Sequence, residues 1–310
     1  MPISIADGDV RKISTDRLSL GVVPGLGAGL AWLRSIEDGA VTWRWLRETS
    51  AEPASVPSEL GCFLLVPFSN RIADARFQVG GRDVRLPVNF APEPHMIHGV
   101  GWRSVWHVAE CTRSHMTLTL DWDGEDWPWR FSASVTYVLL DDGLTATLHV
   151  RNDDTSPMPS GLGFHPYFPR RPDVRLNLDA EAVVLNDDAM VPQQLSRTHD
   201  ALTVLRAGDP LPDGLDNGLK GWTGSAAITW PDQAKQLQIE TSPPSNWAIL
   251  FTPSNQDWFC FEPVTHQTNA HNGPLPGVAD TGLRHLAPGE SQAFEMRLTL
   301  SDAVPAARPV

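Results

Sequence analysis

The chain has few lysines and a deficit of positive charge. Only three of its 310 residues are lysine, and Asp plus Glu outnumber Lys plus Arg by 37 to 24, which gives a formal net charge of −13. An acidic surface repels nucleic acid and anionic membranes, so neither is an expected partner. The overall charge also gives no help in holding a phosphorylated substrate, unless arginines gather locally.

Cysteine and long apolar runs are equally scarce. The three cysteines, Cys62, Cys111 and Cys260, are widely spaced and odd in number, and Cys62 and Cys260 lie in apolar stretches, so we expect buried free thiols. The opening segment MPISIADGDVRK lacks the apolar part of a signal peptide. No uninterrupted apolar run approaches the ~20 residues of a membrane helix. These features predict a soluble, cytoplasmic protein.

The sequence also lacks a long stretch with a helical period, while 27 prolines and 24 glycines divide it into short elements. Alternation with period two is its clearest pattern. Residues 132–140 and 144–152 alternate on either side of Asp141-Asp142-Gly143 and predict a β-hairpin. Similar alternation occurs at 116–122, 174–185, 235–241 and 292–299. We therefore predict an all-β chain, a large antiparallel β-sandwich forming one domain over 1–310, with its core at roughly 10–302.

Two segments place polar residues in apolar surroundings. The run CFLLVPF ends in Ser69-Asn70-Arg71, and an arginine there needs a partner or access to solvent. In HMIHGVGWRSVW (95–106), His95 and His98 lack a third ligand at metal-site spacing, so no metal is predicted. The glycines of this stretch would let the backbone approach a ligand, and Trp102 and Trp106 offer flat faces to a sugar ring.

Two further segments hold candidate acid–base groups. In GLGFHPYF (161–168), glycines and a proline flank His165, which is either a buried core residue or an acid–base group that titrates near neutrality. Glu262 ends the aromatic run WFCFE, and a desolvated glutamate has the raised pKa that suits a base. Asp216 in PDGLDNGLKGW is by itself a turn residue.

Together these segments resemble the aldose 1-epimerase (galactose mutarotase) family. The resemblance runs from NRIADARF near residue 70, through HGVGW, GLGFHPYF, LDNGLKGW and EPVTH followed by Asn, to LRHLAPGES at 283–291, in the order that the family has them. It implies the family's β-sandwich (a supersandwich) with a wide sugar-binding face. It also implies a small-molecule sugar as the substrate and no cofactor.

The resemblance implies a role for each matched residue. Glu262 would be the general base and His165 the general acid. His98 and Arg71, with Asn70 beside it, would bind sugar oxygens, and Asp216 would accept hydrogen bonds from sugar hydroxyls. The implied reaction is the interconversion of the α and β anomers of a free aldohexose, such as galactose or glucose, by acid–base opening and closure of the ring. The base and the acid are expected on opposite sides of the unit formed by the ring oxygen and the anomeric carbon.

Other functions fit the same residues less well. A hexose-6-phosphate mutarotase would need cations at the pocket rim, for which the chain offers Arg76, Arg82, Arg103, Arg170 and Arg171. A glycoside hydrolase would use Asp216 and Glu262 as its carboxylate pair but needs no histidine. A non-catalytic sugar-binding protein would have no use for both Glu262 and His165. The sequence leaves open whether the protein is a monomer or a homodimer, and whether His95 or His98 faces the site.

Overall fold

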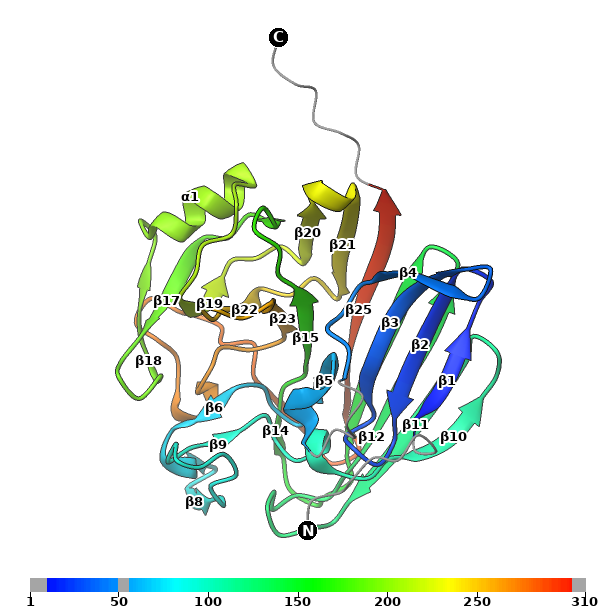
Figure 1. Cartoon of the computed structure of the whole chain (residues 1–310). Helices are drawn as coiled ribbons and strands as arrows, with labels where there is room; N and C mark the ends of the chain where they lie inside the picture. The colour runs from blue at the N-terminus through cyan, green and yellow to red at the C-terminus, as the bar shows by residue number, and fades with distance from the viewer. Residues whose placement is uncertain (1–9, 50–55, 303–310) are drawn as a thin grey trace.

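Two large antiparallel sheets stack against each other in the computed structural model, which describes residues 10–49 and 56–302 (Figure 1). The 11-stranded sheet consists, in spatial order, of β1 (Arg11–Ser14), β2 (Leu18–Val23), β3 (Gly29–Glu37), β5 (Cys62–Leu65), β15 (Gly163–Pro169), β23 (Trp258–Val264), β22 (Trp247–Thr252), β19 (Leu215–Lys220), β17 (Ala182–Asn186) and β18 (Pro192–Ser196), with β4 (Ala40–Arg44) paired to β3.

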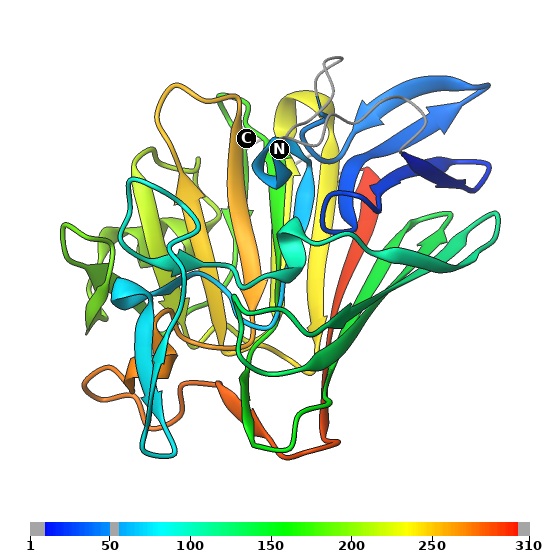
Figure 2. The ribbon, with the colours of Figure 1, turned by 90° about the horizontal axis from the view of Figure 1, so that it is seen from below.

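The 8-stranded sheet forms the second layer (Figure 2). Its order is β10 (His107–Cys111), β11 (His115–Trp122), β12 (Phe131–Leu140), β13 (Gly143–Asn152), β25 (Ser291–Asp302), β21 (Lys235–Ser242), β20 (Ser225–Trp230) and β16 (Arg175–Asn177).

Short elements complete the fold. Three strand pairs are β6 (Arg71–Ile72) with β9 (Met96–Ile97), β7 (Arg76–Val79) with β8 (Arg82–Arg85), and β14 (Met158–Ser160) with β24 (Arg284–Leu286). Helix α1 spans Asp200–Ala207, and single 3₁₀ turns span Pro57–Glu59, Ala73–Ala75, Gly101–Arg103, Pro231–Gln233 and Ala270–Asn272. Within the described ranges, no helix has the length and apolar character needed to cross a membrane.

The predicted β-sandwich is confirmed, as is the predicted hairpin. β12 and β13 pair over their whole length, and Leu140 lies opposite Gly143 at the turn. The alternation in β13 separates buried Leu144, Ala146 and Leu148 from half-buried Thr145 and Thr147. Cys62 and Cys260 are buried free cysteines, as predicted, and Cys111 is exposed.

Two expectations about local structure were wrong or incomplete. The alternating stretch 174–185 is not one strand: β16 and β17 belong to different sheets, and residues 178–181 carry the chain between them. Alternation reports which side chains are buried, and it does not reveal that the chain changes sheets. Helix α1 was missed because eight residues are too few for a clear helical period. It begins after His199, whose Nδ1 accepts from the Ala201 N–H, and ends at Gly208 with φ 64°.

The period of two in the central strands decides which residues face the functional side of the 11-stranded sheet. In β15, Phe164 and Phe168 join the core between the two sheets, so His165 and Tyr167 lie on the other face. The same parity applies to β23, where Phe259 and Phe261 join that core and Glu262 lies opposite. In Figure 1 the segment containing β6, β8 and β9 lies below these strands.

Candidate active site

His165 and Glu262 meet across two neighbouring strands. In the antiparallel register of β15 and β23, Gly163 pairs with Val264 and Tyr167 with Cys260. This register sets His165 opposite Glu262. The His165 Nε2 and Glu262 Oε1 atoms are 3.2 Å apart, with side chains only 9% and 4% exposed. The sequence predicted both residues as candidates, but their contact depends on strand register, which the sequence does not reveal.

Two aromatic rings pack against the His165 imidazole. Phe63 from β5 stacks with it at a ring-centroid distance of 4.3 Å, and Tyr167 stacks with it at 4.9 Å. The Arg47 guanidinium lies 3.7 Å from the Tyr167 ring centroid. These stacking contacts fix the plane of the imidazole, and its Nε2 atom lies beside Glu262 Oε1.

Asn70 and His98 hold each other through reciprocal hydrogen bonds. Both have left-handed backbone conformations, with φ 56° and 63°. The His98 N–H donates to the Asn70 carbonyl at 2.9 Å, and the Asn70 N–H donates to His98 Nδ1 at 3.2 Å. Because Nδ1 accepts, the neutral imidazole carries its proton on Nε2 and can donate a hydrogen bond to a ligand.

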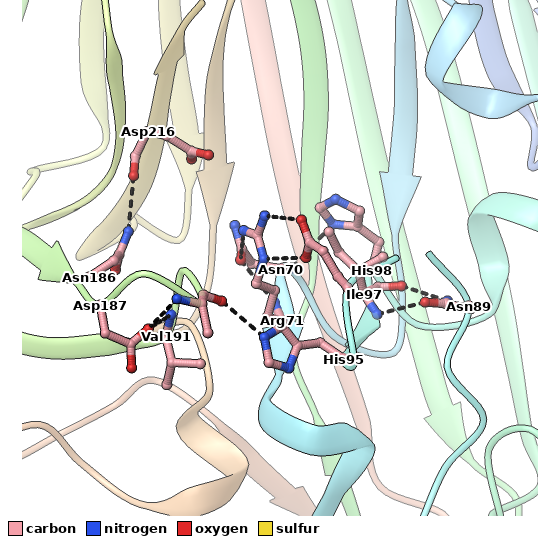
Figure 3. Close-up of polar contacts among 12 residues, drawn as sticks. Asn70, Arg71, Asn89, His95, Ile97, His98, Asn186, Asp187, Val191 and Asp216 are labelled. Carbon is pink, nitrogen blue, oxygen red and sulfur yellow. Dashed lines mark hydrogen bonds and ion pairs between the residues drawn. The ribbon is translucent and has the colours of Figure 1, made fainter. Parts of the chain in front are cut away.

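Arg71 is almost fully buried and ion-paired, so it has the partner that its sequence context requires. Its Nε and Nη2 groups donate to the two carboxylate oxygens of Glu93 at 2.7 and 2.9 Å, and its Nη1 donates to Asn70 Oδ1 at 3.3 Å (Figure 3). This bidentate contact fixes the plane of the guanidinium.

The structure places His98 on the site and turns His95 away from it. His95 Nδ1 accepts from the Asp74 N–H at 3.0 Å, and its Nε2 donates to the Ala189 carbonyl at 2.9 Å (Figure 3). Both ring nitrogens of His95 are thus used by the backbone. His95 therefore has a structural role, in contrast to His98.

Asp216 lies in strand β19 rather than in the turn that its neighbours favour. Its carbonyl accepts from Asn186 Nδ2 at 3.0 Å, and its N–H donates to Asn217 Oδ1 at 3.3 Å. These main-chain contacts fix its position and leave its carboxylate on the same face of the sheet as Glu262.

All six residues proposed from the sequence line one cavity of about 270 Å³. The remaining lining residues are Ser58, Phe63, Phe90, Glu93, Ile97, Trp102, Tyr167 and Phe251. Trp106, expected to face a sugar, instead packs in the core between the sheets, where its indole N–H donates to the Gly101 carbonyl at 2.9 Å. A larger cavity of about 330 Å³, bordered by Pro243–Trp247, contains none of the six.

Burial sets the protonation of the central pair. Burial raises the pKa of Glu262 well above its ordinary value, and the negative charge of Asp216 adds to this effect while Arg71 opposes it. Burial also lowers the pKa of His165 below its ordinary value. We infer that the resting pair is neutral overall and holds one proton between Oε1 and Nε2. Burial likewise lowers the pKa of His98, with His165 and Arg71 contributing, and keeps it neutral.

The glycines beside His98 and His165 are required by close packing against other segments of the protein. Neither Gly161 nor Gly163 has a positive φ. A Cβ on Gly161 would instead lie 1.8 Å from His266 Cδ2. Similarly, a Cβ on Gly99 would meet the Val66 carbonyl at 2.4 Å. These glycines allow protein segments, rather than a ligand, to approach closely.

Sequence reasoning missed two residues that hold the Asn70–Arg71 segment in place. His266 Nε2 accepts from the Ser69 N–H at 3.0 Å. The Asn269 N–H donates to the Arg71 carbonyl at 3.0 Å. Both follow Glu262 within EPVTHQTN, which is the only signal that the sequence offers for them. The tertiary structure shows that this one segment carries Glu262 and also positions Arg71.

We expect His266 to make stability depend on acid. Burial lowers its pKa from 6.5 to about 4, so between these values the unfolded chain binds a proton that the folded chain does not. The free energy of unfolding should therefore fall as the pH drops from about 6.5 to about 4, by roughly 3 kcal/mol from this residue. Urea unfolding at several pH values measures the slope.

His266→Gln and His266→Leu separate the charge of this residue from its hydrogen bond. The glutamine retains an acceptor for Ser69 and should flatten the acid dependence, whereas the leucine should also reduce sugar turnover by displacing Asn70 and Arg71. An unchanged acid slope in both variants would show that His266 does not titrate in this way.

Three comparisons with known proteins show which proteins the chain is similar to. A family model described as aldose 1-epimerase matches residues 21–299. The uncharacterized Escherichia coli K12 protein YphB is 31% identical over 283 residues, which cover 84% of this chain and 93% of that protein. The galactose mutarotase of Mus musculus is 31% identical over 135 residues, covering 40% and 38%. The crystal structure of a galactose mutarotase-like protein from Clostridium acetobutylicum superposes with a TM-score of 0.83 at 19% identity, covering 94% of each chain.

Proposed function

Because the chain belongs to the aldose 1-epimerase family, we propose that it interconverts the α and β anomers of a free aldohexose such as galactose or glucose. The observation that carries the proposal is the buried contact between His165 Nε2 and Glu262 Oε1 on the wall of the sugar-sized cavity. It supplies one acid and one base that share a proton, which is what the reaction needs.

The proposed reaction balances protons within the pair. Transfer of the shared proton from Glu262 Oε1 to His165 Nε2 gives a carboxylate and an imidazolium. The carboxylate takes the proton of the anomeric hydroxyl while the imidazolium protonates the ring oxygen, and the bond between this oxygen and the anomeric carbon breaks. Rotation of the resulting aldehyde and reversal of both transfers closes the ring on the other face.

The close spacing of the pair suits this chemistry and revises the expected arrangement. The sequence suggested an acid and a base on opposite sides of the sugar. The two reacting oxygens are bonded to the same carbon, however, so they lie closer together than a hydrogen bond is long. Adjacent groups such as Oε1 of Glu262 and Nε2 of His165 can therefore serve both oxygens from one side.

The other lining residues would orient the sugar. In our proposal the His98 Nε2–H and the free donors of Arg71 bind sugar oxygens and stabilise charge that develops on them, as preorganised donors do elsewhere. The Asp216 carboxylate accepts hydrogen bonds from hydroxyl groups. Trp102 and Phe251 supply apolar surface for the ring face.

Polarimetry or NMR exchange spectroscopy on freshly dissolved α-galactose and α-glucose tests the proposed activity. We expect the purified protein to accelerate the approach to anomeric equilibrium at catalytic concentrations, because the pair replaces slow proton transfer to water. A rate equal to that of buffer for every aldose tested would reject the proposal. Saturable sugar binding in the same samples would then indicate a non-catalytic binding protein.

The phosphorylated and hydrolytic alternatives have less support. None of the arginines considered as phosphate ligands lines the cavity: Arg76, Arg82, Arg103, Arg170 and Arg171. The contact of Glu262 with a histidine is not required for a carboxylate-pair hydrolase. Faster turnover of glucose 6-phosphate than glucose would favour the first alternative, and release of reducing sugar from disaccharides would favour the second.

A further inference from the structure

Acidic side chains outnumber basic side chains in the lining of the cavity. Among its described lining residues Arg71 is the only arginine or lysine, whereas three are carboxylic acids: Glu93, Asp216 and Glu262. Glu262 is accounted for by the proposed acid–base pair and Asp216 by hydroxyl binding. Glu93, which lies between β8 and β9, has no role in that chemistry.

Glu93 occupies the part of Arg71 that would otherwise bind an anion. A guanidinium holds a carboxylate or phosphate best through two parallel N–H groups. In this structure the Nε and Nη2 groups of Arg71 already donate to the two oxygens of Glu93, at 2.7 and 2.9 Å. The donors that remain are the second N–H of Nη2 and those of Nη1, and Nη1 already contacts Asn70 Oδ1 at 3.3 Å.

Glu93 also places a negative charge in the lining of the cavity. The Glu93 side chain is 27% exposed and the Arg71 side chain 11% exposed, so the carboxylate is the more accessible end of the pair. The hydrogen bond from Arg71 keeps the pKa of Glu93 below its ordinary value, so the group is ionised at neutral pH. A second anion beside it is repelled most strongly at low ionic strength.

We propose that Glu93 is a specificity-determining residue that restricts the cavity to uncharged aldoses and excludes sugars carrying a carboxylate or phosphate. The inference rests on the proposed function for the identity of the ligand as a sugar. The sugar is then selected by a residue that orients Arg71 and takes no part in the reaction.

Matched sugars that differ only in charge test this role. Equilibrium binding of methyl α-galactopyranoside and of the corresponding methyl galacturonoside is measured by calorimetry at low salt, and neither compound can interconvert its anomers. Wild-type protein should prefer the uncharged glycoside. In Glu93→Gln the ratio of the two dissociation constants should fall by about tenfold, which corresponds to about 1.4 kcal/mol.

Two control variants separate charge from structure. Glu93→Asp keeps the negative charge and should keep the preference for the uncharged glycoside. Glu290→Gln removes one charge from an ion pair with Arg284 that does not line this cavity, and it should leave the ratio unchanged. Circular dichroism and the binding of the neutral glycoside show that each variant is folded.

The proposal is overturned if wild-type protein binds both glycosides equally, or if the ratio in Glu93→Gln stays within threefold of the wild-type ratio. Turnover of galactose and galacturonate is measured separately. If neither is interconverted the proposed function fails, while the binding ratio still decides the role of Glu93.

Discussion

Replacement of Glu262 by glutamine is expected to slow anomer interconversion by about 10²–10⁴-fold, the usual contribution of a positioned acid–base group. Glutamine has nearly the same shape and can still hydrogen-bond to His165 Nε2, but it cannot take a proton from the anomeric hydroxyl. The substitution therefore removes the shared proton from the 3.2 Å contact but keeps the packing around it. NMR exchange spectroscopy on galactose or glucose measures the rate.

The same variant should remain folded. Burial raises the pKa of Glu262, so ionisation in the unfolded chain favours unfolding as the pH rises above the ordinary value of 4.5. The amide removes this effect, and the melting temperature at pH 7 should be no lower than that of wild type. A folded Glu262→Gln protein with near-normal turnover would contradict the role of Glu262 as base.

Replacement of His165 by asparagine is expected to lower the rate to a similar extent. His165 is the only described residue whose side chain contacts Glu262 in an ion pair. Phe63 and Tyr167 stack against its ring and hold it beside Glu262. Asparagine fills part of the space but supplies no titrating proton.

The pH dependence distinguishes loss of the acid from mere loss of packing. In the proposed mechanism the wild-type pair acts with one proton, so kcat/KM should show a plateau, with an acid limb from protonation of the pair and an alkaline limb from its deprotonation. In His165→Asn the residual rate should rise with pH as Glu262, whose pKa is raised, becomes ionised. A wild-type profile merely scaled down would instead indicate a structural role for His165.

The local pattern of the chain predicted the faces of its strands but not their neighbours. Alternation in 132–152 was sufficient for a hairpin because its two strands are adjacent in sequence and share one turn. The stretch 174–185 showed the same pattern yet divides between two sheets. Pairing between distant strands depends on packing of the whole sandwich, which a period of two does not encode.

The candidate site was likewise predicted only in part. The residue types and the order of the motifs were enough to select Asn70, Arg71, His98, His165, Asp216 and Glu262, all of which line one cavity. The HGVGW match favoured His98 over His95, but residue type alone did not separate them, because the difference lies in the backbone: Asn70 binds one ring, and Asp74 and Ala189 bind the other.

The sequence by itself determined the class of fold and the chemical groups available, since both follow from local periodicity and from residue identity. Only the tertiary structure decided which of these groups touch. The register of β15 against β23 brings His165 to Glu262, and the return of the chain at residues 266–269 fixes Arg71. The fold also brings Glu93, unnoticed in the sequence, onto the guanidinium of Arg71, because contacts between distant segments depend on how the strands pack together.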